Sequence, residues 1–228
     1  MTILIIGSAD EPHATHVMER LSSRASSPQV YYLDTRLYPS EMQLGFTQAL
    51  GHDAGGVETF QAHRDAPQIP LAEIQSVYWR HHHGIHPPKL EDAFLAQMAY
   101  REIESALGSF LRGLDCLWVN SIEAIEMHRY KGYQLKLLQQ AGIRVPQTLV
   151  TNSPGALRAF YEQQEGNVIY KPVRGGAHTS AITPDDLSDV RLAELEKAPV
   201  QFQEKIPGVD IRVYCVGGEL FAAEIQAD

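Results

Sequence analysis

Two lysines and one extended segment stand out for their chemistry. Lys131 opens a predicted helix, and Lys171 ends a predicted strand just before a loop with two glycines. A lysine ammonium in either place neutralises phosphate, and glycines let backbone amides approach phosphate oxygens. The third feature is the segment 203–210, with the sequence Gln-Glu-Lys-Ile-Pro-Gly-Val-Asp. It combines an extended strand that can pair with adenine and a carboxylate that can accept hydrogen bonds from the ribose hydroxyls. The order of these features predicts a site for a nucleoside triphosphate.

Each lysine also has a plainer interpretation when it is taken alone. Lys171 fits a solvated lysine in a hairpin turn, and Lys131 fits one of the many solvated lysines at helix starts. The glycines after Lys171 are not followed by Gly-Lys-Ser/Thr, and no Gly-x-Gly-x-x-Gly follows the first strand. A P-loop ATPase and a dinucleotide-binding dehydrogenase therefore lose support.

The first half of the chain alternates strands and helices. Apolar runs predict strands at residues 2–6, 30–33, 76–80 and 116–119, and amphipathic stretches predict helices at about 13–24 and 90–111. Phe94, Leu95, Met98, Ile103 and Leu107 have helical spacing, and the aromatic residues of 90–111 are expected in the core rather than at a partner surface. Residues 42–61 favour a hairpin. The pattern predicts a parallel α/β domain over residues 1–119.

The second half, residues 120–228, mixes helices with antiparallel strands. Helices are predicted at about 130–140, 154–164 and 183–197, where Ser153-Pro154 and Thr183-Pro184 are helix-start signals. Strands are predicted at 148–151, 168–171 and 200–206. Two alternating runs, 211–216 and 219–225, are joined by Gly217-Gly218 and predict a hairpin.

Composition limits the possible partners. The 228 residues carry a net charge of −9 and a pI of about 5.5, so a general attraction to nucleic acid or to an anionic membrane is not expected. The first apolar run is far shorter than the roughly 18 residues of a membrane span. Cys116 and Cys215 are too few for a disulfide framework and lie in apolar runs, so we expect reduced, buried thiols in a cytoplasmic protein.

Four phrases of the second half resemble the ATP-grasp ligase superfamily, and within it the branch of peptide-modifying glutamate ligases and ribosomal-peptide macrocyclases. They are Lys131-Gly-Tyr-Gln-Leu135, Gly142-Ile-Arg-Val-Pro-Gln-Thr148, Tyr170-Lys171-Pro172 and Gln203-Glu-Lys-Ile206. The resemblance covers roughly residues 120–226. It implies an α/β pre-ATP-grasp domain followed by an α+β ATP-grasp domain, of which this chain holds an incomplete part.

The resemblance also assigns roles to individual residues. It implies that Lys131 and Lys171 contact phosphates, with Lys171 on the α and β phosphates, under a flap that comprises Arg174, Gly175, Gly176 and Thr179. Gln203 and the backbone of Glu204 and Ile206 would contact adenine, and Asp210 the ribose. Arg212 would lie near the transferred phosphate and, with Lys171, would be catalytic.

The implied reaction joins a carboxylate to an amine or a hydroxyl after ATP has phosphorylated the carboxylate. The substrate would be a peptide or a small amino-acid-like molecule. Mg²⁺ would assist, with its ligands, an acid and a Glu-x-Asn pair, expected beyond residue 228, so no metal ligand is predicted here. A nucleotide-binding module that lacks ligase activity and works through a partner is the alternative. Neither the substrates nor the oligomeric state follow from the sequence.

Arg80 and the histidines at positions 81, 82, 83 and 86 form the remaining polar segment. Four imidazoles in six positions can bind zinc or nickel, but adjacent side chains on an extended chain point to opposite sides and no cysteine or carboxylate completes a set nearby. A polar loop is therefore favoured over a metal-binding protein. By the resemblance, Arg80 faces the cleft and contacts an acidic substrate.

Overall fold

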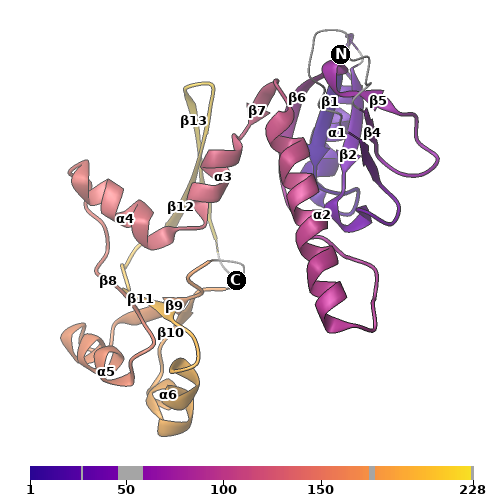
Figure 1. Ribbon diagram of the computed structural model, residues 1–228. Helices are drawn as coiled ribbons and strands as arrows, with labels where there is room; N and C mark the ends of the chain where they lie inside the picture. The colour runs from indigo at the N-terminus through magenta and orange to yellow at the C-terminus, as the bar shows by residue number, and fades with distance from the viewer. Residues whose placement is uncertain (27, 46–58, 175–177, 227–228) are drawn as a thin grey trace. The chain divides into compact units, whose positions relative to one another are not determined.

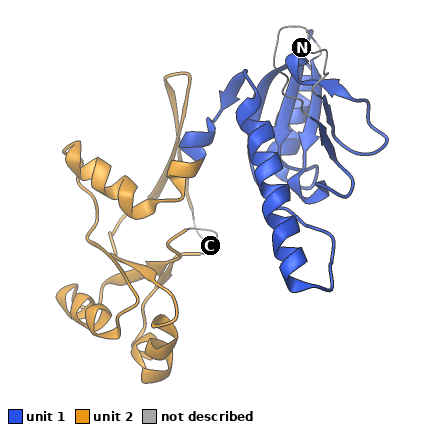
Figure 2. Ribbon diagram, viewed as in Figure 1, with its two compact units in different colours: residues 1–125 blue, residues 126–228 orange. Residues whose placement is uncertain are grey.

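The computed structural model describes residues 1–26, 28–45, 59–174 and 178–226. The chain divides into two compact units, Met1–Ile125 and Glu126–Asp228 (Figure 2). Helix α3 (Ile122–His128) runs across the junction between them. Each unit has its own hydrophobic core.

Unit 1 is built on a parallel sheet with the strand order β2-β1-β6-β7 (Figure 1). These strands are β1 (Thr2–Ile6), β2 (Gln29–Leu33), β6 (Ile74–Trp79) and β7 (Leu117–Val119). Helix α1 (Pro12–Ser22) connects β1 to β2, and α2 (Ala93–Gly113) connects β6 to β7. The apolar run at the N-terminus forms the fully buried β1. The predicted parallel α/β arrangement is confirmed.

A small antiparallel sheet, β3-β4-β5, completes unit 1. Strand β3 (Gln43–Gly45) pairs with β4 (Thr59–Gln61), and β4 pairs with β5 (Ile69–Pro70). The pairing of β3 with β4 agrees with the predicted hairpin, whose glycines 51, 55 and 56 lie outside the described residues. Short 3₁₀ helices, Thr35–Leu37 and Leu71–Glu73, follow β2 and β5.

Helix α2 buries only its C-terminal half. The prediction that the aromatic residues of this helix belong to the core is confirmed for Phe110 but was wrong for Phe94 and Tyr100, which are exposed. Leu95 and Met98 are exposed as well. Helical spacing identifies the face that an apolar stripe occupies, but not how far along the helix the sheet extends beneath it. The buried residues of α2 are Ile103, Leu107, Phe110 and Leu111.

Unit 2 contains an antiparallel sheet with the order β10-β9-β11-β8. Its strands are β8 (Thr148–Thr151), β9 (Val168–Lys171), β10 (Ser180–Ala181) and β11 (Val200–Glu204). Helices α5 (Pro154–Gln163) and α6 (Asp189–Leu195) pack on one face around Leu157, Leu192 and Phe202. Helix α4 (Lys131–Gln140) precedes the sheet in the chain (Figure 1). The predicted helix at 183–197 is divided into a 3₁₀ turn, Pro184–Leu187, and α6, because Ser188 has extended backbone.

The last described element is the hairpin of β12 (Asp210–Val216) and β13 (Glu219–Ile225). Gly217 and Gly218 form its two-residue turn with φ of 58° and 89°, values that favour glycine, so the predicted hairpin is confirmed. Within the described residues the two strands pair only with each other and are exposed along their length. Cys215 is therefore exposed, contrary to the prediction of a buried thiol, whereas Cys116 packs against the core of unit 1. Both cysteines are free.

None of the helices in the described ranges combines the length and the apolar character required to cross a membrane.

Candidate functional site

Strand pairing gathers polar side chains on the face of the unit 2 sheet opposite α5 and α6. Gln201 pairs with Lys171, and Gln203 pairs with both Ile169 and Thr148. Because side chains alternate along a strand, these residues share one face, whereas Phe202 points into the helical core. The face opposite α5 and α6 therefore carries Lys171 and Gln203, two of the residues that the sequence predicted for the nucleotide.

Lys171 and Gln203 are joined directly. The Lys171 Nζ donates a hydrogen bond of 2.9 Å to Gln203 Oε1, and Gln203 Nε2 donates one of 2.8 Å to Thr148 Oγ1. Gln203 is buried, and Lys171 and Thr148 are partly buried. Sequence reasoning missed Thr148 because its place beside Gln203 depends on the register of β8 against β11, which no local pattern reveals.

Lys131 lies at the first position of α4, where free backbone N–H groups favour an anion. Its Nζ lies 3.3 Å from Nε2 and 3.4 Å from Nδ1 of the His128 ring. Partial burial, together with the positive charge of Lys171, lowers the pKa of Lys131 below its usual value. The fold thus brings the two predicted lysines close enough for their charges to repel, and a bound polyanion would relieve that repulsion.

The segment after β11 is extended and exposed. The backbone N–H of Glu204 donates to the carbonyl of Gln147 at 2.9 Å, so this N–H is not open to a base. The backbone N–H of Ile206 has no acceptor among the described residues, and its side chain is exposed. A carbonyl and an N–H two residues apart on an extended chain match the donor and acceptor edge of adenine.

Asp210 and Arg212 lie at the start of β12, and both are exposed. In the described part of the chain, no hydrogen bond or ion pair connects either of them to Lys131, Lys171 or Gln203. Of the predicted flap, Arg174 and Thr179 are exposed, and Gly175 and Gly176 lie outside the described residues. The roles given to these residues remain predictions.

Arg80, in unit 1, is held by an acid. Its Nε and Nη2 lie 3.1 and 2.8 Å from Glu11 Oε1, while Glu11 Oε2 accepts the N–H of Ala14 at 2.6 Å and caps α1. The predicted contact with an acidic substrate would have to compete with Glu11.

The histidines that follow Arg80 have contacts of their own. His83 Nε2 lies 2.9 Å from Ser8 Oγ, and the rings of His81 and His83 meet edge to face at 4.4 Å. Across the described ranges, no three candidate metal ligands come together. The preference for a polar loop over a metal site remains a prediction.

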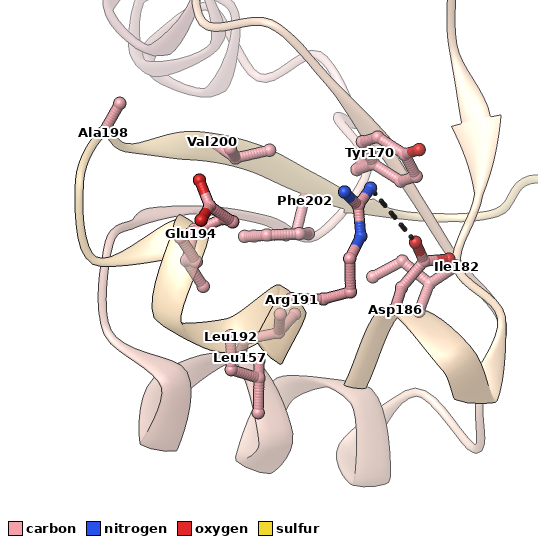
Figure 3. Close-up of a pocket in the computed structure, with 11 residues that line it drawn as sticks. Leu157, Tyr170, Ile182, Asp186, Arg191, Leu192, Glu194, Ala198, Val200 and Phe202 are labelled. Atoms are coloured by element: carbon pink, nitrogen blue, oxygen red, sulfur yellow. Dashed lines mark ion pairs between the residues drawn. The ribbon is translucent and has the colours of Figure 1, made fainter. Parts of the chain in front are cut away.

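A pocket in unit 2 lies on the helical face of the sheet (Figure 3). Leu157, Tyr170 and Phe202 line it, and at one side Arg191 Nη2 lies 3.8 Å from Asp186 Oδ1. None of the predicted site residues lines this pocket. It is separated by the sheet from the face that carries Lys171 and Gln203.

Residues 2–126 match the model of the MvdD pre-ATP grasp domain. Among solved structures, the ATP-grasp ligase PsnB complexed with minimal precursor is 32% identical, with a TM-score of 0.74 over 99% of this chain and 71% of that chain. Macrocyclase MdnC from Microcystis aeruginosa MRC, bound with precursor peptide MdnA, is 24% identical, with a TM-score of 0.83 over 100% and 73% of the two chains, a likeness of fold. No curated protein matches the chain.

A third similar structure contains a bound nucleotide. The RiPP-associated ATP-grasp ligase of Chryseobacterium gregarium, in complex with ADP and a leader and core peptide, is 25% identical, with a TM-score of 0.78 over 98% of this chain and 68% of that chain. The fold and these matches define the class of protein as an enzyme, an ATP-grasp ligase. Within that class, the chain belongs to the family that carries the MvdD pre-ATP grasp domain.

Proposed function

We propose that this chain binds ATP on the face of the β10-β9-β11-β8 sheet opposite α5 and α6, and uses it to join a carboxylate of a peptide to an amine or a hydroxyl. The observation that carries this proposal is the proximity of two lysines: partial burial and, beside it, the charge of Lys171 lower the pKa of Lys131. Neither lysine forms an ion pair within the described residues. A polyanion that bridges them satisfies both charges.

The proposed arrangement of ATP follows the positions of these groups. The ammonium groups of Lys131 and Lys171 offset the charge of the phosphates. The carbonyl of Glu204 and the N–H of Ile206 pair with adenine, and Asp210 accepts the ribose hydroxyls. The adenine contact predicted for Gln203 competes with its present hydrogen bonds to Lys171 and Thr148.

The proposed reaction needs no covalent nucleophile from the protein. A substrate carboxylate oxygen attacks the γ-phosphorus, ADP leaves, and an acyl phosphate forms. An amine or hydroxyl then attacks the acyl carbon and loses a proton as inorganic phosphate departs. The fixed cations stabilise charge during phosphoryl transfer, with Arg212 proposed near the transferred group.

Mg²⁺ accompanies ADP in a PsnB complex. In nucleotide sites this ion is usually held by phosphates together with one or two carboxylates. The described residues of this chain bring no three candidate ligands together, so we assign none of them to the metal. The chemistry proposed for this chain rests on its own lysines and on Arg212.

Turnover tests this function. The chain is incubated with Mg-ATP and short peptides that carry acidic residues together with lysine or serine, and ADP release is followed beside the peptide mass. A ligase releases ADP only with a suitable peptide, which loses one water. ADP binding without turnover on any peptide favours the nucleotide-binding module, and failure to bind ADP contradicts both functions.

A further inference from the structure

Gln203 differs from the other predicted adenine contacts because both ends of its side-chain amide are already bonded within the protein. We propose that Gln203 is a positioning residue for Lys171, and that Thr148 fixes the orientation of its amide. The inference rests on the proposed binding of ATP. It changes the predicted role of Gln203 from contacting the base to placing a cation that contacts phosphate.

The register of the sheet makes the Lys171 contact possible. Gln203 lies two residues along β11 from Gln201, the direct partner of Lys171, so Lys171 and Gln203 are diagonal neighbours on one face. Diagonal neighbours lie within reach of long side chains. The Gln203 side chain is buried, so its amide does not readily exchange these partners for water.

The Lys171 ammonium, the Gln203 amide and the Thr148 hydroxyl can form these hydrogen bonds with only one assignment of donors and acceptors. An ammonium only donates, so the atom of Gln203 that faces Lys171 must be the carbonyl oxygen. The amide nitrogen must then donate, and it reaches Thr148 Oγ1. The Thr148 hydroxyl gives its own proton to the carbonyl of Pro146 at 2.9 Å, which leaves its oxygen free to accept from Gln203. The hydrogen bonds therefore form a relay, in which Lys171 donates to Gln203, Gln203 donates to Thr148 and Thr148 donates to the carbonyl of Pro146.

This relay suits a lysine that binds phosphate. Gln203 uses one of the three N–H donors of Lys171 and leaves two for phosphate oxygens. The amide is neutral, so it holds the ammonium without cancelling its positive charge. A carboxylate in the same place would cancel that charge. A flexible lysine that is already placed loses less freedom when the ligand binds.

The test compares ADP with adenosine, which has the same base and ribose but no phosphate. Dissociation constants are measured by competition with a fluorescent adenine nucleotide for wild type, Gln203→Met, Lys171→Met, the double variant and Thr148→Val. Gln203→Met should weaken ADP about tenfold and leave adenosine within about twofold of wild type. In the Lys171→Met background it should have almost no further effect, since the residue acts through that lysine.

Thr148→Val should weaken ADP in the same sense but less, because Gln203 Oε1 can still accept from Lys171, and the amide loses only the Thr148 oxygen that fixes its orientation. This second variant tests the relay if Gln203→Met does not fold. Gln164→Met is the matched control, since its amide donates to Gln147 at 2.8 Å, away from the lysines.

Equal weakening of ADP and adenosine by Gln203→Met would mean that Gln203 contacts the base, and the inference would be wrong. Additive losses in the double variant, or normal ADP binding by both Gln203→Met and Thr148→Val, would also overturn it. If wild type binds no ADP, the proposed function itself fails, which is a distinguishable result.

Discussion

Replacing Lys171 by methionine separates the structural role of this residue from its role in binding. The variant keeps a long, unbranched side chain but removes the donor to Gln203 Oε1. A buried acceptor that loses its partner costs about 1–3 kcal/mol. Removing a positive charge near Lys131 offsets part of that cost. We therefore expect the free energy of unfolding to fall by only about 1 kcal/mol.

The effect on ADP should be larger than the effect on stability. A hydrogen bond between a lysine ammonium and a phosphate contributes about 1.5–3 kcal/mol, and each 1.4 kcal/mol changes affinity about tenfold. Lys171→Met should therefore weaken ADP about 10- to 150-fold in titration calorimetry. The substitution should also change the pKa of Lys131: without the charge of Lys171, that pKa should rise toward its usual value.

The control removes the same charge elsewhere in unit 2. Lys197 is exposed and pairs only with Glu194, at 2.7 Å, among the described residues. Lys197→Met should bind ADP as wild type does. If Lys171→Met binds ADP within twofold of that control while remaining folded, Lys171 is not a phosphate ligand and the proposed site is wrong.

Three further predictions concern the stability of the two units. Arg36→Met should lower the stability of unit 1 by about 2 kcal/mol in urea denaturation, because it leaves the buried Asp34 carboxylate without its 2.6 Å partner; an unchanged midpoint would contradict this. Hydrogen bonds from the backbone and hydroxyl of Thr183 lower the pKa of Asp186 below 3.8, so the stability they give is present above pH 3.8 and is lost as the pH falls through the folded pKa. Asp186→Asn should therefore destabilise at pH 7, and progressively less as the pH falls through the folded pKa; a loss of stability that does not change with pH would contradict this. Phe202→Ala should cost about 3–5 kcal/mol in thermal unfolding, yet the folded fraction should still bind ADP, because the ring faces the helical core; normal stability would refute its place there.

The sequence predicted most elements whose signals are local. Apolar runs between turn residues gave the strands of both units, and two glycines between alternating runs gave the β12-β13 hairpin. The order of strands and helices gave the parallel sheet of unit 1. These features depend on residues that are neighbours in the chain, which is why pattern and propensity suffice.

What the sequence could not predict depends on packing between distant segments. Periodicity placed Phe94 and Met98 on an apolar face, but the packed surface ends before it reaches them. Cys215 lies in an alternating run that is typical of a strand with one buried face. Among the described residues, however, no second layer covers this strand. The two lysines were found from their local contexts, whereas their proximity depends on where α4 lies relative to β9. The hydrogen bonds from Lys171 through Gln203 to Thr148 require the register of three strands.

Titration calorimetry of ADP into the wild-type chain and into the Lys131→Met/Lys171→Met variant tests the central claim most directly. The account predicts a saturable isotherm for wild type and its loss in the double variant, with the fold of the variant retained by circular dichroism. Binding of equal strength by the two proteins, or no binding by wild type, would contradict the assignment of these lysines to a nucleotide site.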